Sequence, residues 1–123
     1  MTPSDLPYRE RYAELYNRSK EGGIRKVESA EEFIFKLNST ETDFLYIPAK
    51  HTIQVYLAMK GLGFTSNFEK LYELTRQEIG EEFANMFHYL FSLNEKQFDA
   101  TKEECILGLE YAKKILALYS SEV

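Results

Sequence analysis

The reactive side chains of this sequence are few: two histidines, His51 and His88, and a single cysteine, Cys105. An imidazole can accept a proton, a phosphoryl group or a metal ion, and a thiolate can act as a nucleophile. No second histidine or cysteine lies at metal-ligand spacing from His88, and the carboxylates within residues 78–82 lack the Glu-x-x-His pairs of a di-iron bundle. The sequence therefore predicts no metal, no cofactor and no catalytic set. It favours a non-enzymatic role and leaves enzymatic activity open.

His51 falls on the only polar strip of an otherwise apolar helical projection, which predicts that it faces solvent. The letters HTIQVYLAMKGLG resemble part of a histidine phosphotransfer domain. The resemblance implies a phosphoryl group carried on His51, and it makes phosphotransfer the first alternative function. That family's motif has lysine and glycine at the third and fourth positions after the histidine, where this chain has Gln54 and Val55. The sequence thus shows no cation near His51 to stabilise phosphate.

A helix-turn-helix nucleic-acid binder is the second alternative, with its turn at residues 61–66. Aligning Gly63 with the turn glycine puts Glu69 at a position that should be apolar. The chain has 15 basic and 20 acidic residues, and its net charge of −5 opposes attraction to phosphate backbones. Nucleic acid is therefore a disfavoured partner.

Aromatic residues suggest a different kind of function, the recognition of another protein. The chain has nine tyrosines and nine phenylalanines, and tyrosine suits interfaces because it combines apolar area with a hydrogen-bonding tip. A stripe near the N-terminus has basic neighbours, and its candidate partner-binding residues are Tyr8, Arg9, Tyr12 and Tyr16. The alternative interpretation, which we favour for most of these tyrosines, is that they dock the helix onto the core while their hydroxyl groups reach water.

A second candidate partner-binding surface is acidic. Glutamates at helical intervals predict a charged face that could cover a basic surface on a partner and raise the rate of encounter. Its members are Glu73, Glu78, Glu81 and Glu82. Together, the two surfaces favour protein–protein binding by an inhibitor, an immunity-type factor or a regulatory or accessory subunit. The sequence leaves self-association into a homo-oligomer open.

Helices must position these side chains, because apolar residues recur at helical intervals along most of the chain. Ser66 with Glu69, and Thr101 with Glu104, have the spacing of capping boxes that begin helices. The predicted helices are residues 5–20, 29–38, 48–62, 66–90 and 101–119. About five helices with short connections predict an all-α fold, a compact bundle or orthogonal array, in one helical domain over residues 1–123.

Some boundaries in this scheme depend on glycines. Gly22 and Gly23 are expected to stop the first helix, and Gly63 is expected to end the third. Gly80 is expected inside the fourth helix, at a cost of about 1 kcal/mol relative to alanine. The secondary structure of residues 43–59 is left undecided between a helix and a short β-hairpin, because the two apolar runs in this segment also suit strands.

The compartment follows from cysteine usage and hydropathy. A single cysteine cannot form an internal disulfide, which fits a reducing environment. The N-terminal residues lack an apolar stretch of signal-peptide length, and no run approaches the roughly 18 apolar residues that would span a membrane. The sequence therefore predicts a soluble cytoplasmic protein that does not associate with membranes.

Overall fold

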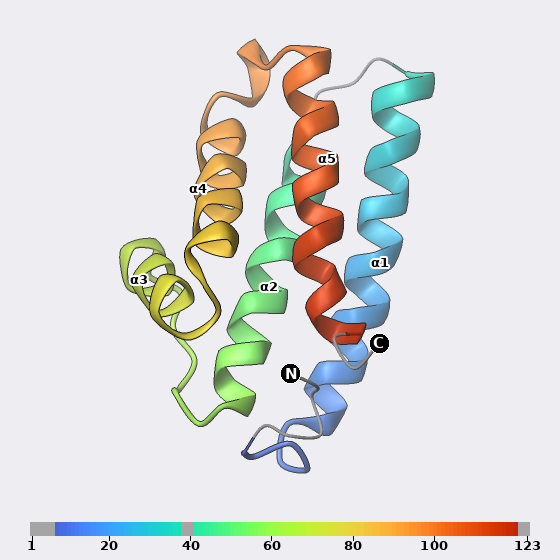
Figure 1. Ribbon diagram of the computed structural model, residues 1–123. Helices are drawn as coiled ribbons and strands as arrows, with labels where there is room; N and C mark the ends of the chain where they lie inside the picture. Colours follow the sequence, from blue (N-terminus) through green and yellow to red (C-terminus); the bar gives the residue numbers. More distant parts are fainter. Residues whose placement is uncertain (1–6, 38–40, 121–123) are drawn as a thin grey trace.

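The computed structural model describes residues 7–37 and 41–120, and within these residues it contains helices and no strand (Figure 1). The all-α prediction is thus confirmed, and the alternative of a β-hairpin at residues 43–59 is wrong. The elements are α1 (Ala13–Lys36), α2 (Asp43–Met59), α3 (Phe68–Glu78), α4 (Glu81–Glu95), the 3-10 helix η2 (Gln97–Asp99), α5 (Lys102–Leu116) and the 3-10 helix η3 (Ala117–Ser120). None of the described helices is both long and apolar enough to cross a membrane.

Four helices lie lengthwise beside one another and alternate in direction: α1 and α4 run upward in Figure 1, and α2 and α5 run downward. The short helix α3 lies at the outer edge, where it packs against α4 and α2. Helix α2 is the centre of the bundle, because it contacts each of the other four helices. The arrangement is an antiparallel bundle with α3 as an added flank.

The hydrophobic core forms around α2, in which twelve of 17 residues are buried. Ile53 and Leu57 belong to one buried cluster with Ile34 of α1, Leu90 of α4 and Ile115 of α5. Each such side chain contributes about 1.5–3 kcal/mol when it leaves water. A helix satisfies its own backbone hydrogen bonds, so it can be surrounded on all sides without partner strands. This burial of all but a narrow strip around the exposed His51 explains why the apolar runs of α2 form a helix and not a hairpin.

Helix α1 is continuous where the sequence predicted two helices, at residues 5–20 and 29–38, and that prediction is wrong. The first two residues of the range 5–20 and the last of 29–38 lie outside the described residues. The glycine pair inside α1 costs helix stability, about 1 kcal/mol per residue. Packing offsets this cost, because Gly23 is buried at a position where an added Cβ would contact Leu116 and Pro48.

The predicted long helix at residues 66–90 is also wrong, because Gly80 divides it into α3 and α4. Gly80 has φ 142° and ψ 157°, a conformation that residues with a side chain rarely adopt. The break lets α3 fold back against α4. Helix α3 begins one residue later than predicted: Asn67, not Ser66, is its N-cap, and its side-chain oxygen accepts a hydrogen bond from the Lys70 N–H at 2.9 Å.

Helix α2 ends at Met59, and Gly61, not Gly63 as predicted, is the left-handed residue that follows its C-cap. The N–H of Leu62 donates to the Leu57 carbonyl and that of Gly61 donates to the Ala58 carbonyl, both at 3.0 Å. This pair of bonds defines a Schellman motif, with Gly61 in the left-handed conformation at φ +83°. The left-handed glycine that closes α2 therefore lies two residues earlier than the sequence indicated.

The start of α5 is as predicted. The Thr101 hydroxyl accepts a hydrogen bond from the Glu104 N–H at 3.1 Å, and the Glu104 carboxylate accepts one from the Thr101 N–H at 2.9 Å. This capping box satisfies two backbone donors that the first turn would otherwise leave without partners.

Candidate functional site

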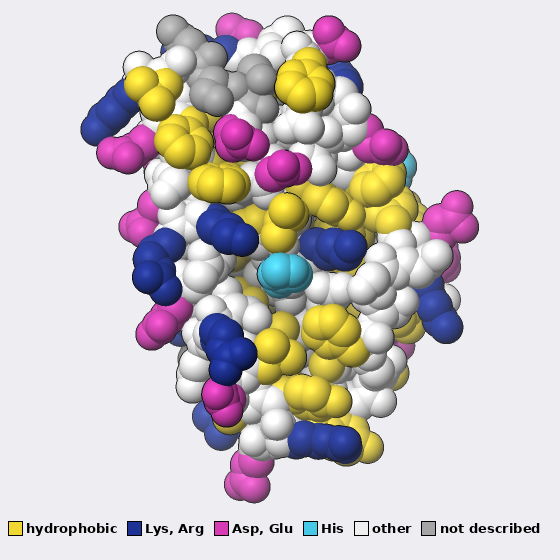
Figure 2. Space-filling model, turned by 180° about the vertical axis from the view of Figure 1, so that it is seen from behind, with side chains coloured by type: hydrophobic (Ala, Val, Ile, Leu, Met, Phe, Trp, Pro, Cys, Tyr) yellow, Lys and Arg dark blue, Asp and Glu magenta, His cyan; other side chains and the backbone are white. Residues whose placement is uncertain are grey.

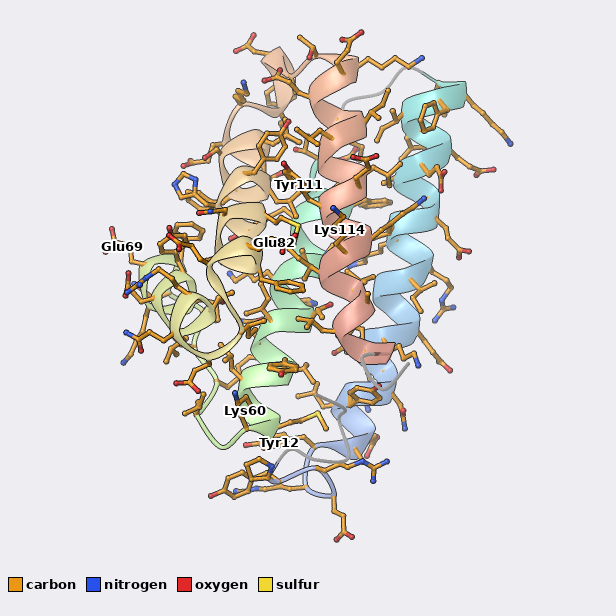
Figure 3. The ribbon with its side chains drawn as sticks, in the orientation of Figure 1. Tyr12, Lys60, Glu69, Glu82, Tyr111 and Lys114 are labelled. Carbon is orange, nitrogen blue, oxygen red and sulfur yellow. The ribbon has the colours of Figure 1, made fainter. Side chains whose placement is uncertain are left out.

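One end of the bundle combines exposed aromatic, apolar and basic side chains, and we call it the N-terminal tip. It is built by residues 7–12, which form turns before α1, and by the chain that follows α2. Its exposed members are Tyr8, Arg9, Glu10, Arg11, Leu62 and Phe64, and Tyr12 and Lys60 lie partly buried beside them. Figure 3 shows Tyr12 and Lys60 together at this end of the molecule.

Tyr8 links the two segments of the tip. Its φ of 62° is uncommon for a residue other than glycine, and its carbonyl accepts a hydrogen bond from the Tyr12 N–H at 3.1 Å. The Tyr8 ring lies so close to Gly61 that a Cβ atom at that position would overlap it. The absence of a side chain at Gly61 is therefore what allows the ring to rest on the end of α2.

Apolar area at the tip is open to solvent and has a cation beside it. The exposed fractions are 51% for Tyr8, 39% for Leu62 and 53% for Phe64. The Arg11 guanidinium lies 6.0 Å from the Tyr8 ring centroid and 5.8 Å from that of Tyr12, within reach of cation–π attraction. In Figure 2, which shows hydrophobic side chains over much of this face, some of them lie at the lower end of the molecule beside a basic side chain.

Tyr16, another candidate from the aromatic stripe, is directed into the molecule. Its hydroxyl donates a hydrogen bond to the Tyr119 carbonyl, and the two rings meet edge to face with centroids 5.2 Å apart. Burial raises the pKa of Tyr119 to about 12. Tyr16 thus fastens α1 to the final turn of the described chain. It packs against the core as the docking interpretation predicts, and so does Tyr12, but the Tyr16 hydroxyl bonds to the protein and not to water as that interpretation expected.

The four glutamates of the acidic surface do not form one face. Glu73 pairs with Arg76 at 2.9 Å, and this hydrogen bond lowers the pKa of Glu73. Glu78 lies 3.5 Å from a lysine ammonium at the end of α2, and Glu81 is near enough to Arg76 to raise the pKa of that guanidinium. Three of the carboxylates thus have basic neighbours. Glu82 lies apart from them, on the side of α4 that faces α5.

Glu82 lines a groove of about 340 Å³ between α4 and α5, which we call the α4–α5 groove. Its lining residues are Glu82, Asn85, Met86, Tyr89, Tyr111 and Lys114. The Tyr89 and Tyr111 rings meet edge to face, with centroids 5.2 Å apart, and the Tyr89 hydroxyl donates to the Glu104 carbonyl at 2.9 Å. Figure 3 shows Glu82, Tyr111 and Lys114 together between the two helices.

Sequence reasoning found only one residue of this groove. Tyr111 and Lys114 lie on a different helix from Glu82, and nothing in their local pattern distinguishes them from other residues on the surface of α5. They become neighbours of Glu82 only through the antiparallel packing of α4 and α5. The missing signal is therefore a tertiary one.

His51 is exposed on α2, as predicted, but its neighbours differ from the prediction. Partial desolvation lowers the pKa of His51, and the ammonium groups of Lys26 and Lys50 lower it further. The inference that no cation lies near His51 is thus wrong, because Lys26 of α1 and Lys50 are close enough to lower the pKa of the imidazole. Gln54 is buried, and its amide donates to the Thr65 carbonyl at 2.8 Å.

The other two reactive side chains have simpler surroundings. His88 is exposed beside the rings of Phe68 and Tyr72, with centroids 5.9 and 5.8 Å from its own. Cys105 is buried, and burial raises the pKa of its thiol, which disfavours the nucleophilic thiolate. Within residues 7–37 and 41–120, no three His, Cys, Asp or Glu side chains gather closely enough to hold a metal ion.

Comparison of this chain with protein families, curated proteins and solved structures finds no match.

Proposed function

We propose that this protein acts by binding another protein and that the N-terminal tip is the binding surface. The observation that carries the proposal is the position of Tyr8, a half-exposed aromatic residue resting on Gly61 with the Arg11 guanidinium near its ring. Tyrosine and arginine are among the residues that dominate the binding energy of protein interfaces. A side chain that is already held in place loses less conformational entropy on binding than a mobile one.

The charges of the tip indicate the chemistry of the partner. Arg9 and Arg11 are exposed and have no ion-pair partner among the described residues. Two arginines against the single exposed carboxylate of Glu10 leave the segment basic, so the tip suits an apolar pocket rimmed by carboxylates. A basic partner surface, as predicted from the glutamates, has weaker support because Glu73, Glu78 and Glu81 already have basic neighbours. The inhibitor, immunity-type or regulatory role and the cytoplasmic location stay predictions.

Site-specific cross-linking in the source cell tests the proposal. A photoreactive phenylalanine analogue replaces Phe64 in the tip or, as a matched control, Phe98 of η2 at the opposite end of the bundle, which is 92% exposed. We expect a defined partner cross-linked from position 64 and absent from position 98. No cross-link from position 64, or the same products from both positions, would contradict the proposal.

A pair of glycine variants tests whether the position of Tyr8 matters. In Gly61→Ala the new Cβ would displace the Tyr8 ring, whereas in Gly63→Ala, with a similar φ of +86°, it would enter open space. Both variants should lose about 1–2 kcal/mol of stability from the left-handed backbone. Only Gly61→Ala should also reduce co-purification of the partner found by cross-linking. If the two variants co-purified equal amounts of the partner, the position of Tyr8 would not matter for binding, and Tyr8 would not belong to the binding surface.

Phosphotransfer through His51 is a second candidate, favoured by the two lysines near it. Because the pKa of His51 is lowered, its imidazole is neutral and nucleophilic over more of the physiological pH range. Lys26 and Lys50 could stabilise the added phosphate. Incubation with acetyl phosphate should give an acid-labile phosphoryl label that His51→Gln removes and His88→Gln keeps. A protein that takes up no label would exclude this candidate.

A further inference from the structure

We propose that the α4–α5 groove binds a small zwitterion of the amino-acid class, with its ammonium group against Glu82 and its carboxylate against Lys114. The groove and the N-terminal tip are built from different elements, so this proposal does not depend on the proposed function.

The first observation is that opposite charges face one groove without pairing. Glu82 enters from α4 and Lys114 from α5 (Figure 3). Within the described part of the chain, neither forms an ion pair. The neighbouring Lys113, by contrast, pairs with Glu31 at 3.1 Å. A ligand that carries both charges could occupy the space between Glu82 and Lys114 and give each a charge-assisted hydrogen bond.

The second observation concerns the neutral polar groups beside the two charges. The Asn85 amide and the Tyr111 hydroxyl also line the groove, and neither is engaged in a hydrogen bond with a described residue. The Tyr89 hydroxyl differs, because it already donates to the Glu104 carbonyl. Asn85 and Tyr111 are therefore free to supply further donors and acceptors to the ammonium and carboxylate of a ligand.

The third observation is an apolar part of the same groove. Met86 lines the groove and is only 4% exposed, and the rings of Tyr89 and Tyr111 stand beside each other. Methionine and aromatic rings adapt well to an aliphatic side chain. The volume of about 340 Å³ lies at the lower end of the roughly 300–1,000 Å³ that small-molecule sites span. Charge, polarity and size together fit a free amino acid with an aliphatic side chain.

Titration of the protein with L-leucine, followed by amide NMR shifts, tests the proposal. Two analogues act as controls: 3-methylbutylamine lacks the carboxylate, and 4-methylpentanoate lacks the ammonium group. We expect leucine to shift the amides around residues 82–89 and 111–114 with a dissociation constant on the order of 1 mM. Each analogue should bind at least about tenfold more weakly, because it loses one charge-assisted contact.

Variants then assign each charge to its residue. In Glu82→Gln, leucine should bind no more tightly than 4-methylpentanoate, because the ammonium group has lost its partner. In Lys114→Gln, leucine should bind no more tightly than 3-methylbutylamine, because the carboxylate has lost its partner. The adjacent residues provide matched controls, because Glu81→Gln and Lys113→Gln remove the same charges outside the groove. Both controls should bind leucine as the unaltered protein does.

Three results would overturn the proposal. The first is the absence of shifts at 20 mM leucine, on the order of twenty times the expected dissociation constant. The second is equal binding of leucine and both analogues, which would show apolar contact without charge recognition. The third is weakening by the control variants as strong as that by the groove variants, because the effect would then come from net charge and not from the site.

Discussion

Gly22–Gly23 in α1 and Gly80 between α3 and α4 are both glycine sites within runs of helical periodicity, yet the structure treats them in opposite ways. Helix α1, which is 24 residues long, runs through the glycine pair without a break. At Gly80, by contrast, the chain divides into two helices that pack on each other. The sequence predicted a stop at the first site and continuity at the second. Residue type alone therefore did not decide where the helices end.

The difference lies in what each glycine provides. Neither residue of the pair in α1 has a positive φ, and Gly23 is buried against Leu116 and Pro48. A Cβ on Gly23 would meet Leu116 and Pro48 at 3.4 and 3.6 Å, at the edge of ordinary van der Waals contact, so this glycine lies at a packed position with an ordinary helical backbone. Gly80 has φ 142° and no atom within 4 Å of a Cβ placed on it, so its value is its backbone freedom. A glycine can thus support a helix through packing or end one through its dihedral angles.

The largest expected effect in this comparison comes from Gly80→Ala. Alanine cannot adopt φ 142° without strain. Its methyl group would have no atom within 4 Å, so it would gain no packing contact that offsets the strain, and the free energy of unfolding should fall by about 1–3 kcal/mol. Denaturant unfolding followed by circular dichroism measures this loss. An unchanged denaturant midpoint would show that residue 80 can take a φ that suits alanine without loss of stability. The junction of α3 and α4 would then not depend on the backbone freedom of glycine.

Gly22→Ala should have an effect of opposite sign. No atom lies within 4 Å of the added Cβ, so the substitution removes the helix penalty of glycine without a steric cost. We expect a gain of about 1 kcal/mol in the free energy of unfolding. A thermal melt should show a midpoint higher by about 3–5 °C. A loss of stability would mean that α1 needs a bend or a contact at this position.

The success of prediction varied with the range of the interactions that fix each feature. The capping box of Thr101 and Glu104 was predicted correctly, because both of its hydrogen bonds join residues three apart. The predicted first and second helices proved to be one, because contacts with Leu116 and Pro48, far along the chain, offset the glycine penalty. The burial of most of α2 likewise follows from four neighbouring helices that no local pattern describes.

The candidate sites follow the same rule. Tyr8 and Tyr12 were selected from a local stripe of aromatic residues, and the structure places them together at one end of the bundle with Arg11. That Gly61 makes room for the Tyr8 ring could not be foreseen, because the two residues lie on different elements. Lys114 was missed for the same reason. Residues that lie far apart in the sequence and meet only in the folded protein have no characteristic sequence spacing by which their contact could be predicted.

Gly23→Ala should have the smallest effect and is the most direct measure of close packing in α1. The helix gain of about 1 kcal/mol is opposed here, because the new Cβ would lie 3.4 Å from Leu116 Cδ2, so we expect a net change within about 0.5 kcal/mol. Repeating the substitution in a Leu116→Ala background should restore the full gain, since the opposing atom is gone. If Gly22→Ala and Gly23→Ala gave equal gains in the unaltered background, α1 would not depend on close approach at Gly23, and its continuity through the glycine pair would need another cause.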